Sequence, residues 1–139
     1  TTEIYTLSLH DALPISALKK LRPQVLFIIH SDGAVAPLVD DFIEIGFSVY
    51  NPVQPNVPGS DPEELQRKYG QRIAFFGGID QQVLLPSGDE QALRGEIRRR
   101  YEVMGRNGNY LMAPAHIIQA DTSPGMVMAM IAEVKSLVS

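Results

Sequence analysis

The sequence predicts an α/β fold, the C-terminal half of a (β/α)8 barrel with about four βα units of parallel strands. Four short apolar runs recur along the chain, and each ends in polar residues or glycines. A segment with the apolar spacing of a helix follows each run, and alternating strands and helices indicate a parallel sheet with right-handed crossovers. The first and last runs lack the lysines and prolines that protect the edges of open sheets. This favours half of a closed barrel.

The apolar runs define the strands. Residues 25–33, VLFIIHSDG, begin with the longest of them, and such a run is typical of a strand that is buried on both faces. The prolines that follow Tyr50 predict that the second strand ends there. The predicted strands are 25–29, 47–50, 73–76 and 110–113.

Capping residues and glycines define the helices. Residues 17–22 are typical of the last turn of a helix, and a helix over 36–45 ends at Gly46. Ser60 is the predicted N-cap of a helix that ends at Gly70, and Ser87 with Glu90 forms a capping-box pattern. That fourth helix continues to about residue 104, and its run of arginines at 98–100 is typical of a solvated face. A last helix begins near residue 124.

Composition limits the function classes. The 139 residues include 45% hydrophobic and 20% charged residues, and the net charge of −4 argues against a nucleic-acid surface. No apolar run approaches the ~20 residues that span a bilayer, so we expect no membrane association and a cytoplasmic location. Because cysteine is absent, any metal must be held by histidine, aspartate or glutamate.

The first 16 residues differ from the rest. They show no clean helical or strand period, and residues 1–15 match the translation of a common sequencing-adapter oligonucleotide. We therefore expect residues 1–16 to be an artefact. Residues 17–139 would then be the C-terminal half of a single barrel domain that lacks its N-terminal half.

The strand ends carry the candidate site. In a parallel barrel the carboxyl ends of the strands gather at one rim, where such folds build active sites. A zinc site with an open position needs three ligands, which His30, Asp32 and His116 can supply. Without a metal, the same groups can act as general acid and base. The predicted catalytic residues are His116 and Asp80, and the predicted residues that bind a small-molecule substrate are Asn51, Gln54, Gly77, Gly78 and Gln82.

Each of these residues also has a structural interpretation. Asp32 and Asp80 are typical helix- or loop-capping residues, and His30 can be a hydrogen-bonded structural histidine. Asn51 before a proline is a common turn former. Gly77-Gly78 either permits close backbone approach to a ligand or makes a turn, and no phosphate-loop pattern follows it.

Four segments together resemble the uroporphyrinogen decarboxylase family, which includes corrinoid- and thiol-dependent methyltransferases. They are IIHSDG, NPVQP, DPEELQRKYG before FFGGID, and YLMAPAHIIQADTSPGMVMAM, and the resemblance spans residues 21–138. It implies a (β/α)8 barrel with its active site at the carboxyl rim, in agreement with the strand and helix pattern. It also implies an enzyme, of which this part alone is expected to be inactive.

The two branches of the family imply different chemistry. In the methyltransferases a His-x-Cys pair and a later cysteine hold zinc, which activates a thiol for methyl transfer from a corrinoid on a partner protein. His30 matches that histidine, but Asp32 and His116 stand at the two cysteines. In the cofactor-free decarboxylase, a histidine near the last strand lies in the tetrapyrrole cleft, and His116 matches it. We expect the methyltransferase chemistry, with the decarboxylase as the alternative.

Overall fold

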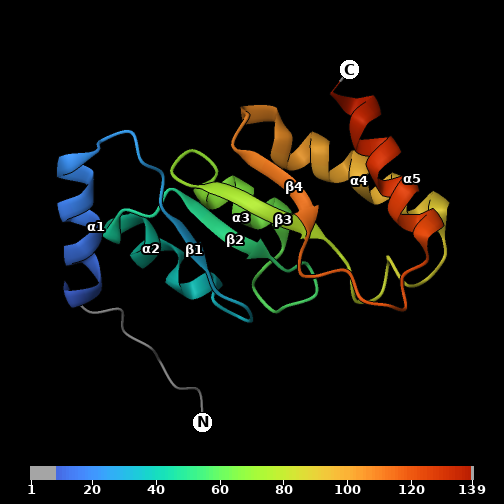
Figure 1. The fold of residues 1–139 in the computed structure, drawn as a ribbon, viewed down its shortest axis with the longest axis horizontal. Coiled ribbons are helices and arrows are strands. Elements are labelled where there is room, and N and C mark those ends of the chain that lie inside the picture. The colour runs from blue at the N-terminus through green and yellow to red at the C-terminus, as the bar shows by residue number, and fades with distance from the viewer. Residues whose placement is uncertain (1–8, 139) are drawn as a thin grey trace, which may run out of the picture.

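Four parallel strands form one sheet in the order β1-β2-β3-β4. The computed structural model describes residues 9–138, and Figure 1 shows the sheet with helices behind it and at its two ends. The predicted α/β fold with four parallel βα units is therefore confirmed. The strands are β1 (Ile28–His30), β2 (Val49–Val53), β3 (Ala74–Ile79) and β4 (Tyr110–Pro114).

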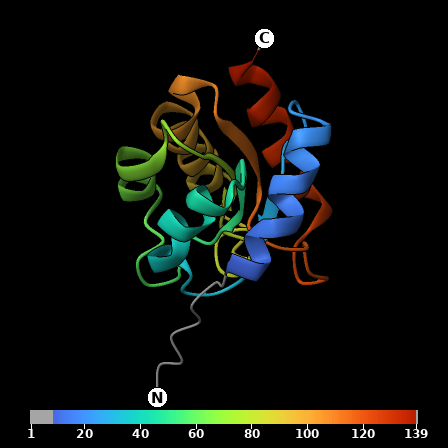
Figure 2. The same ribbon diagram turned by 90° about the vertical axis from the view of Figure 1, so that its left-hand side faces the viewer.

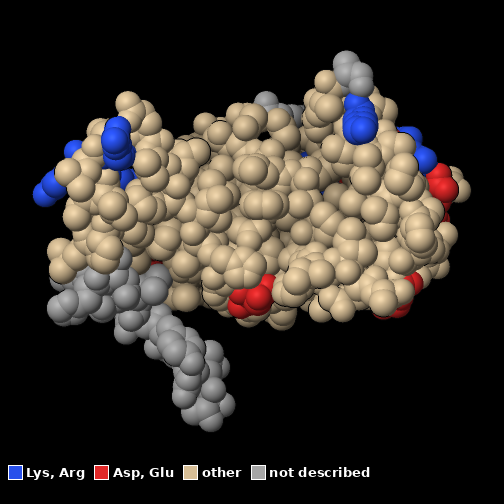
Figure 3. Space-filling model, viewed as in Figure 1, with Lys and Arg blue, Asp and Glu red and all other residues tan. Residues whose placement is uncertain are grey.

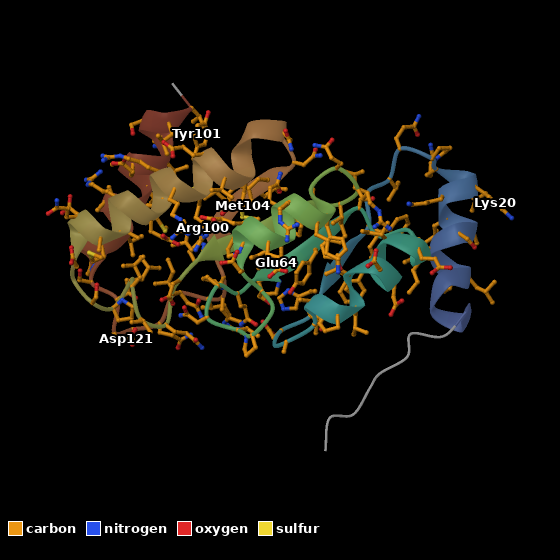
Figure 4. The ribbon with its side chains drawn as sticks, turned by 180° about the vertical axis from the view of Figure 1, so that it is seen from behind. Lys20, Glu64, Arg100, Tyr101, Met104 and Asp121 are labelled. Carbon is orange, nitrogen blue, oxygen red and sulfur yellow. The ribbon has the colours of Figure 1, made fainter. Side chains whose placement is uncertain are left out.

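Helices cover one face of the sheet. Figure 1 shows α3 and α4 behind the strands, and Figure 4, which views the molecule from behind, shows them in front. Helix α1 lies at one end of the molecule beside α2, as Figures 1 and 2 show. The helices are α1 (Leu9–Leu21), α2 (Val39–Ile45), α3 (Pro62–Tyr69), α4 (Glu90–Met104) and α5 (Pro124–Leu137), with 3-10 turns η1 (Ala36–Leu38) and η2 (Gly105–Asn107).

Two apolar clusters lie between the sheet and these helices. The first joins Tyr50 and Phe75 on neighbouring strands to Phe42 of α2 and Leu65 of α3. The second joins the end of β3 to α4 and α5. Both clusters fix the strands against the helix layer, and so they fix where each strand ends.

The helix caps lie close to their predicted places. Of the two cap candidates before the last helix, Ser123 and Thr122, it is Ser123 that caps α5, because its Oγ accepts a hydrogen bond from Met126 N at 3.3 Å. For α3 the prediction was wrong by one residue: Asp61 accepts from Glu64 N at 2.9 Å, and Ser60 is buried. For α4 the predicted capping box of Ser87 and Glu90 was wrong: the N-cap is Asp89, which accepts from Ala92 N at 2.9 Å. A carboxylate competes well for this position because it also faces the positive end of the helix dipole.

The first strand differs from its prediction. It is an edge strand of three residues, and Ile28 is 52% exposed, so the expectation of a strand buried on both faces was wrong. The face of the sheet that points away from the helices is open within the described residues, where Leu26, Ile28 and Leu111 are all exposed. Figure 3 views this side of the molecule, and its central area carries few charged side chains.

The second strand runs further than predicted. It continues through Asn51 and Pro52 to Val53, and the Asn51–Pro52 peptide bond is cis. The pairing of β2 with β3 shifts register between Tyr50 and Val53. Proline has no N–H to donate, so it is tolerated in a strand where the ladder is interrupted in this way.

The N-terminal helix extends beyond its prediction. Residues 17–22 were predicted as its last turn, and α1 begins at Leu9, within the stretch that was expected to be an artefact. Ile15 is buried beside Gly46 at the end of α2. Residues 1–8 lie outside the described part of the chain, and the origin of residues 1–16 stays a prediction.

Candidate functional site

The carboxyl ends of β1 and β2 bring His30 and Asn51 together. These two residues are paired in the register of the parallel sheet, and so their side chains point to the same face. His30 Nδ1 lies 2.6 Å from Asn51 Oδ1. With a carbonyl oxygen as acceptor, Nδ1 carries the proton, and the lone pair of the neutral ring is then at Nε2.

Asp32 faces the other nitrogen of the same ring. Its Oδ2 lies 3.7 Å from His30 Nε2, and both side chains are largely exposed. The Gln54 side chain joins the same two strand ends, because its Oε1 accepts a hydrogen bond from Gly33 N at 2.7 Å. Asn51 thus positions His30, and Gln54 holds the loop after β1 next to Asp32.

A hollow of about 420 Å³ lies at the same ends of the strands. Asp32 from the loop after β1 and His116 from the loop after β4 both line it, although the two loops belong to opposite edges of the sheet. Two of the predicted substrate-binding residues, Gln54 and Gln82, line it as well. The complete lining is Asp32, Gln54, Gln81, Gln82, His116, Gln119 and Asp121.

The predicted metal ligands are brought near one another only in part. His30 contacts Asp32, and Asp32 shares the hollow with His116, whereas His30 does not line it. Among the described residues, no group of three His, Cys, Asp or Glu side chains is arranged to hold a metal ion. A zinc ion with three protein ligands therefore does not fit these side chains as they are placed.

Asp80 and His116 line different hollows, although they follow paired strand ends. Asp80 lines the hollow between the loop after β2 and helix α4. Its carboxylate accepts hydrogen bonds from Gln82 N at 2.8 Å, Val83 N at 3.1 Å and Leu84 N at 3.2 Å. Burial raises the pKa of Asp80, but hydrogen bonds from the Asn56 side chain and these backbone groups outweigh it, so the pKa lies below its usual value. Asp80 is therefore an ionised loop cap.

Gly77 and Gly78 are surrounded by this chain's own atoms. Both have positive φ angles, of 112° and 88°. A Cβ on Gly77 would lie 3.0 Å from Val53 N, and one on Gly78 would lie 2.6 Å from the Tyr110 hydroxyl oxygen. The Tyr110 hydroxyl donates to the Gly77 carbonyl oxygen at 2.7 Å. The close approach that these glycines permit is thus between neighbouring strands.

Arg100 lines the other hollow together with Asp80, and the sequence did not reveal this. It was predicted to lie on a solvated face, but it is only 5% exposed, and its Nε donates to the Gly78 carbonyl oxygen at 3.2 Å. Its Nη2 pairs with Glu96 one turn earlier on α4. Figure 4 shows Arg100 and Tyr101 as neighbours on α4. The spacing of apolar residues could have predicted that Arg100 is buried. Leu93, Ile97 and Arg100 follow one another at intervals of four and three residues, which places all three on the buried face of α4.

Three residues of the hollow that Asp32 and His116 line were missed by the sequence analysis. Gln81, Gln119 and Asp121 belong to the loops after β3 and β4. Loop residues have no periodic pattern, so only their place after a strand end was a signal for them. Figure 4 places Asp121 at the edge of the molecule where the strand-end loops lie.

Comparison with known proteins agrees with this architecture. A family model described as uroporphyrinogen decarboxylase matches residues 12–137. The chain belongs to this family. A search of curated proteins finds no match. The predicted resemblance to the uroporphyrinogen decarboxylase family is confirmed, and the match extends nine residues further toward the N-terminus than the predicted span of 21–138.

A solved structure described as a methyltransferase from Methanosarcina mazei has a similar fold. Its TM-score is 0.66 at 20% sequence identity, over 89% of this chain and 35% of that chain. This chain thus spans about a third of the length of that methyltransferase. In the described part of the chain, no helix is long and apolar enough to cross a membrane. The cytoplasmic location stays a prediction.

Proposed function

We propose that this chain forms part of the barrel of a methyl-transferring enzyme of the uroporphyrinogen decarboxylase family. The substrate would bind at the carboxyl ends of the strands, in the hollow that Asp32 and His116 line. A methyltransferase of similar fold supports the proposal, and the charge of the hollow is the observation that carries it.

The charge of the hollow argues against a substrate that must present a carboxylate. Its lining includes two aspartates, four glutamines and one histidine, and none of these residues is a lysine or arginine. Two like charges about 5 Å apart repel by about 1–3 kcal/mol at a protein surface. A decarboxylase has to bind a carboxylate, and so it would meet this repulsion at the described rim.

His30 lies beside the hollow, next to Asp32, and from there it is suited to remove a proton from the methyl acceptor. The Nδ1–H of His30 donates a hydrogen bond to Asn51, so the lone pair on Nε2 is free. It can take the proton of a thiol or a similar methyl acceptor. The Asp32 carboxylate is 3.7 Å from Nε2, on the side where that proton would be held. In this proposal Asn51 positions the base, and His116 contacts the substrate from the opposite side of the hollow.

The methyl donor would be a corrinoid carried by a partner protein, as the family resemblance implies. The corrinoid supplies a methyl group that a thiolate can accept, and the chain's own residues bind the acceptor and remove its proton. We derive no step through zinc, because the described residues do not form a set of three ligands. The alternative is a cofactor-free decarboxylase, in which His116 contacts a tetrapyrrole.

An assay on the whole protein tests the proposal. With methylcobalamin as donor and a small thiol as acceptor, we expect thioether formation, and we expect His30→Ala to lower the rate by about 100-fold. Glu102→Gln, on α4 and outside the hollow, is the control and should keep the rate. Conversion of uroporphyrinogen to coproporphyrinogen without methylation of the thiol would reject methyl transfer and support the decarboxylase.

A further inference from the structure

We infer that the hollow at the strand ends binds a positively charged ammonium group of a small organic molecule. This inference rests on the proposed function, and it names the class of substrate that the hollow would take. The volume of about 420 Å³ lies within the range of small-molecule sites.

The carboxylates of the hollow come from two separate loops. Asp32 follows β1 at one edge of the sheet, and Asp121 follows β4 at the other edge. Neither carboxylate is paired with a lysine or arginine among the described residues. In Figure 3 acidic atoms mark the lower edge of the molecule, where the strand ends lie, whereas most visible lysine and arginine atoms lie near its two ends.

Gln81 provides an independent indication of a ligand. It lines the hollow, it is only 7% exposed, and its side chain makes no hydrogen bond to another residue in the described part of the chain. The carboxamide of Gln81 is not among the described polar atoms that are sealed from solvent without a partner, so it opens into the hollow and is free to hydrogen-bond a ligand there. The carboxamide oxygen of Gln81 would accept a hydrogen bond from an ammonium N–H in the hollow.

The geometry favours an organic cation over a metal ion. A divalent metal needs several oxygen or nitrogen ligands that converge within about 2–2.6 Å of one point. The described residues offer no group of three such side chains. An alkylammonium ion has no such requirement, because its charge is spread over a larger volume and interacts with carboxylates at longer distance.

Binding of choline to the whole protein tests the inference. Choline and 3,3-dimethylbutan-1-ol have the same shape and differ only in the charge of one atom. We expect choline to bind at least ten-fold more tightly than this neutral probe in isothermal titration calorimetry, with an affinity that falls as salt is raised. Asp32→Asn and Asp121→Asn should each weaken choline binding by about five-fold.

Two controls separate this site from general charge effects. Glu102→Gln changes the net charge by the same amount as either aspartate variant but lies outside the hollow, and it should keep the affinity for choline. Gln81→Leu removes the unpaired carboxamide and should weaken binding of methylammonium, which has N–H groups to donate, more than binding of choline, which has none.

Three results would overturn the inference. They are equal affinity for choline and its neutral analogue, tighter binding of acetate than of choline, and no detectable choline binding at 50 mM. These results are distinct from a failure of the proposed function. If the thiol is not methylated but choline binds with the expected charge preference, the ammonium site stands and the reaction is a different one.

Discussion

Gly78 and Tyr110 illustrate how single residues shape the rim. The Tyr110 hydroxyl occupies the space that a side chain on residue 78 would need, and it donates to the neighbouring Gly77 carbonyl oxygen. Burial raises the pKa of Tyr110, so the hydroxyl stays a neutral donor in the physiological range. The backbone turn at the end of β3 is thus held by a side chain of the adjacent strand.

Gly78→Ala is therefore expected to destabilise the protein by about 2–4 kcal/mol, from the positive φ and the contact with Tyr110. Gly88→Ala is the matched control, because Gly88 also has a positive φ but no atom within 4 Å of the added Cβ, and it should cost about 1 kcal/mol. In a Tyr110→Phe background the cost of Gly78→Ala should fall by at least 1 kcal/mol. Denaturant unfolding of the double-mutant cycle measures this; strictly additive costs would contradict the contact.

Asp80 makes the stability of the fold depend on pH. Its pKa in the folded state lies below the ordinary value of 3.8. A group with a depressed folded-state pKa stabilises the fold above its unfolded-state pKa, and this contribution is lost as the pH falls through the folded-state value. The stability from Asp80 is thus complete near pH 7 and decreases below about pH 4.

Asp80→Asn should lower the free energy of unfolding by about 1 kcal/mol at pH 7, because a neutral amide accepts the three backbone N–H groups less strongly. The difference in free energy of unfolding between Asp80→Asn and the unmodified protein should be smaller at pH 3. Urea unfolding at the two pH values measures it. Asp41→Asn on α2 is the control, since the Asp41 side chain has no hydrogen bond within the described residues. If the free energies of unfolding of Asp80→Asn and the unmodified protein differed more at pH 3 than at pH 7, the hydrogen bonds assigned to Asp80 would be contradicted.

At the scale of elements, α4 connects the helix layer to the rim. Its three consecutive arginines have different environments. Arg98 pairs with Glu133 of α5, Arg99 pairs with Glu63 of α3, and Arg100 points into the core and donates to the end of β3. One helix thus contacts both neighbouring helices and the strand end that precedes the Asp80 loop.

Arg100→Ala is expected to destabilise the protein by about 3 kcal/mol, because it leaves Glu96 and the Gly78 carbonyl oxygen without their buried partner. Arg99→Ala, one position earlier, removes only an exposed ion pair and should cost less than about 1 kcal/mol. Thermal and urea unfolding of the two variants compare these costs. Equal costs would mean that Arg100 is as solvated as its neighbour.

For the whole molecule, the open face of the sheet is the dominant feature. β1 and β4 each have one unpaired edge within the described residues, and Leu26, Ile28 and Leu111 are exposed. Unpaired parallel edges beside an apolar face promote association. In a closed barrel the same face would be the packed interior.

The 139-residue chain by itself is therefore expected to self-associate at 10–100 µM in size-exclusion chromatography with light scattering. Leu111→Lys places a charge on the open face and should shift the chain toward the monomer. Val83→Lys is the control, because Val83 is equally apolar and more exposed but lies in a loop, and it should leave the association unchanged. A monomer at all these concentrations would contradict the role of the open face.

The order of strands and helices, the parallel sheet and the family could be predicted from the sequence, because apolar spacing, glycines and capping residues act over a few positions. The sequence also placed His30, Asp32, Gln54 and His116 at strand ends, since polar residues that follow an apolar run mark those ends. Which of these side chains meet depends on contacts that form when distant segments fold together. Strand register pairs His30 with Asn51, and the approach of the first and last loops places Asp32 and His116 on one hollow. The placement of Asp80 and His116 on different hollows and the burial of Arg100 likewise depend on contacts between segments far apart in the chain.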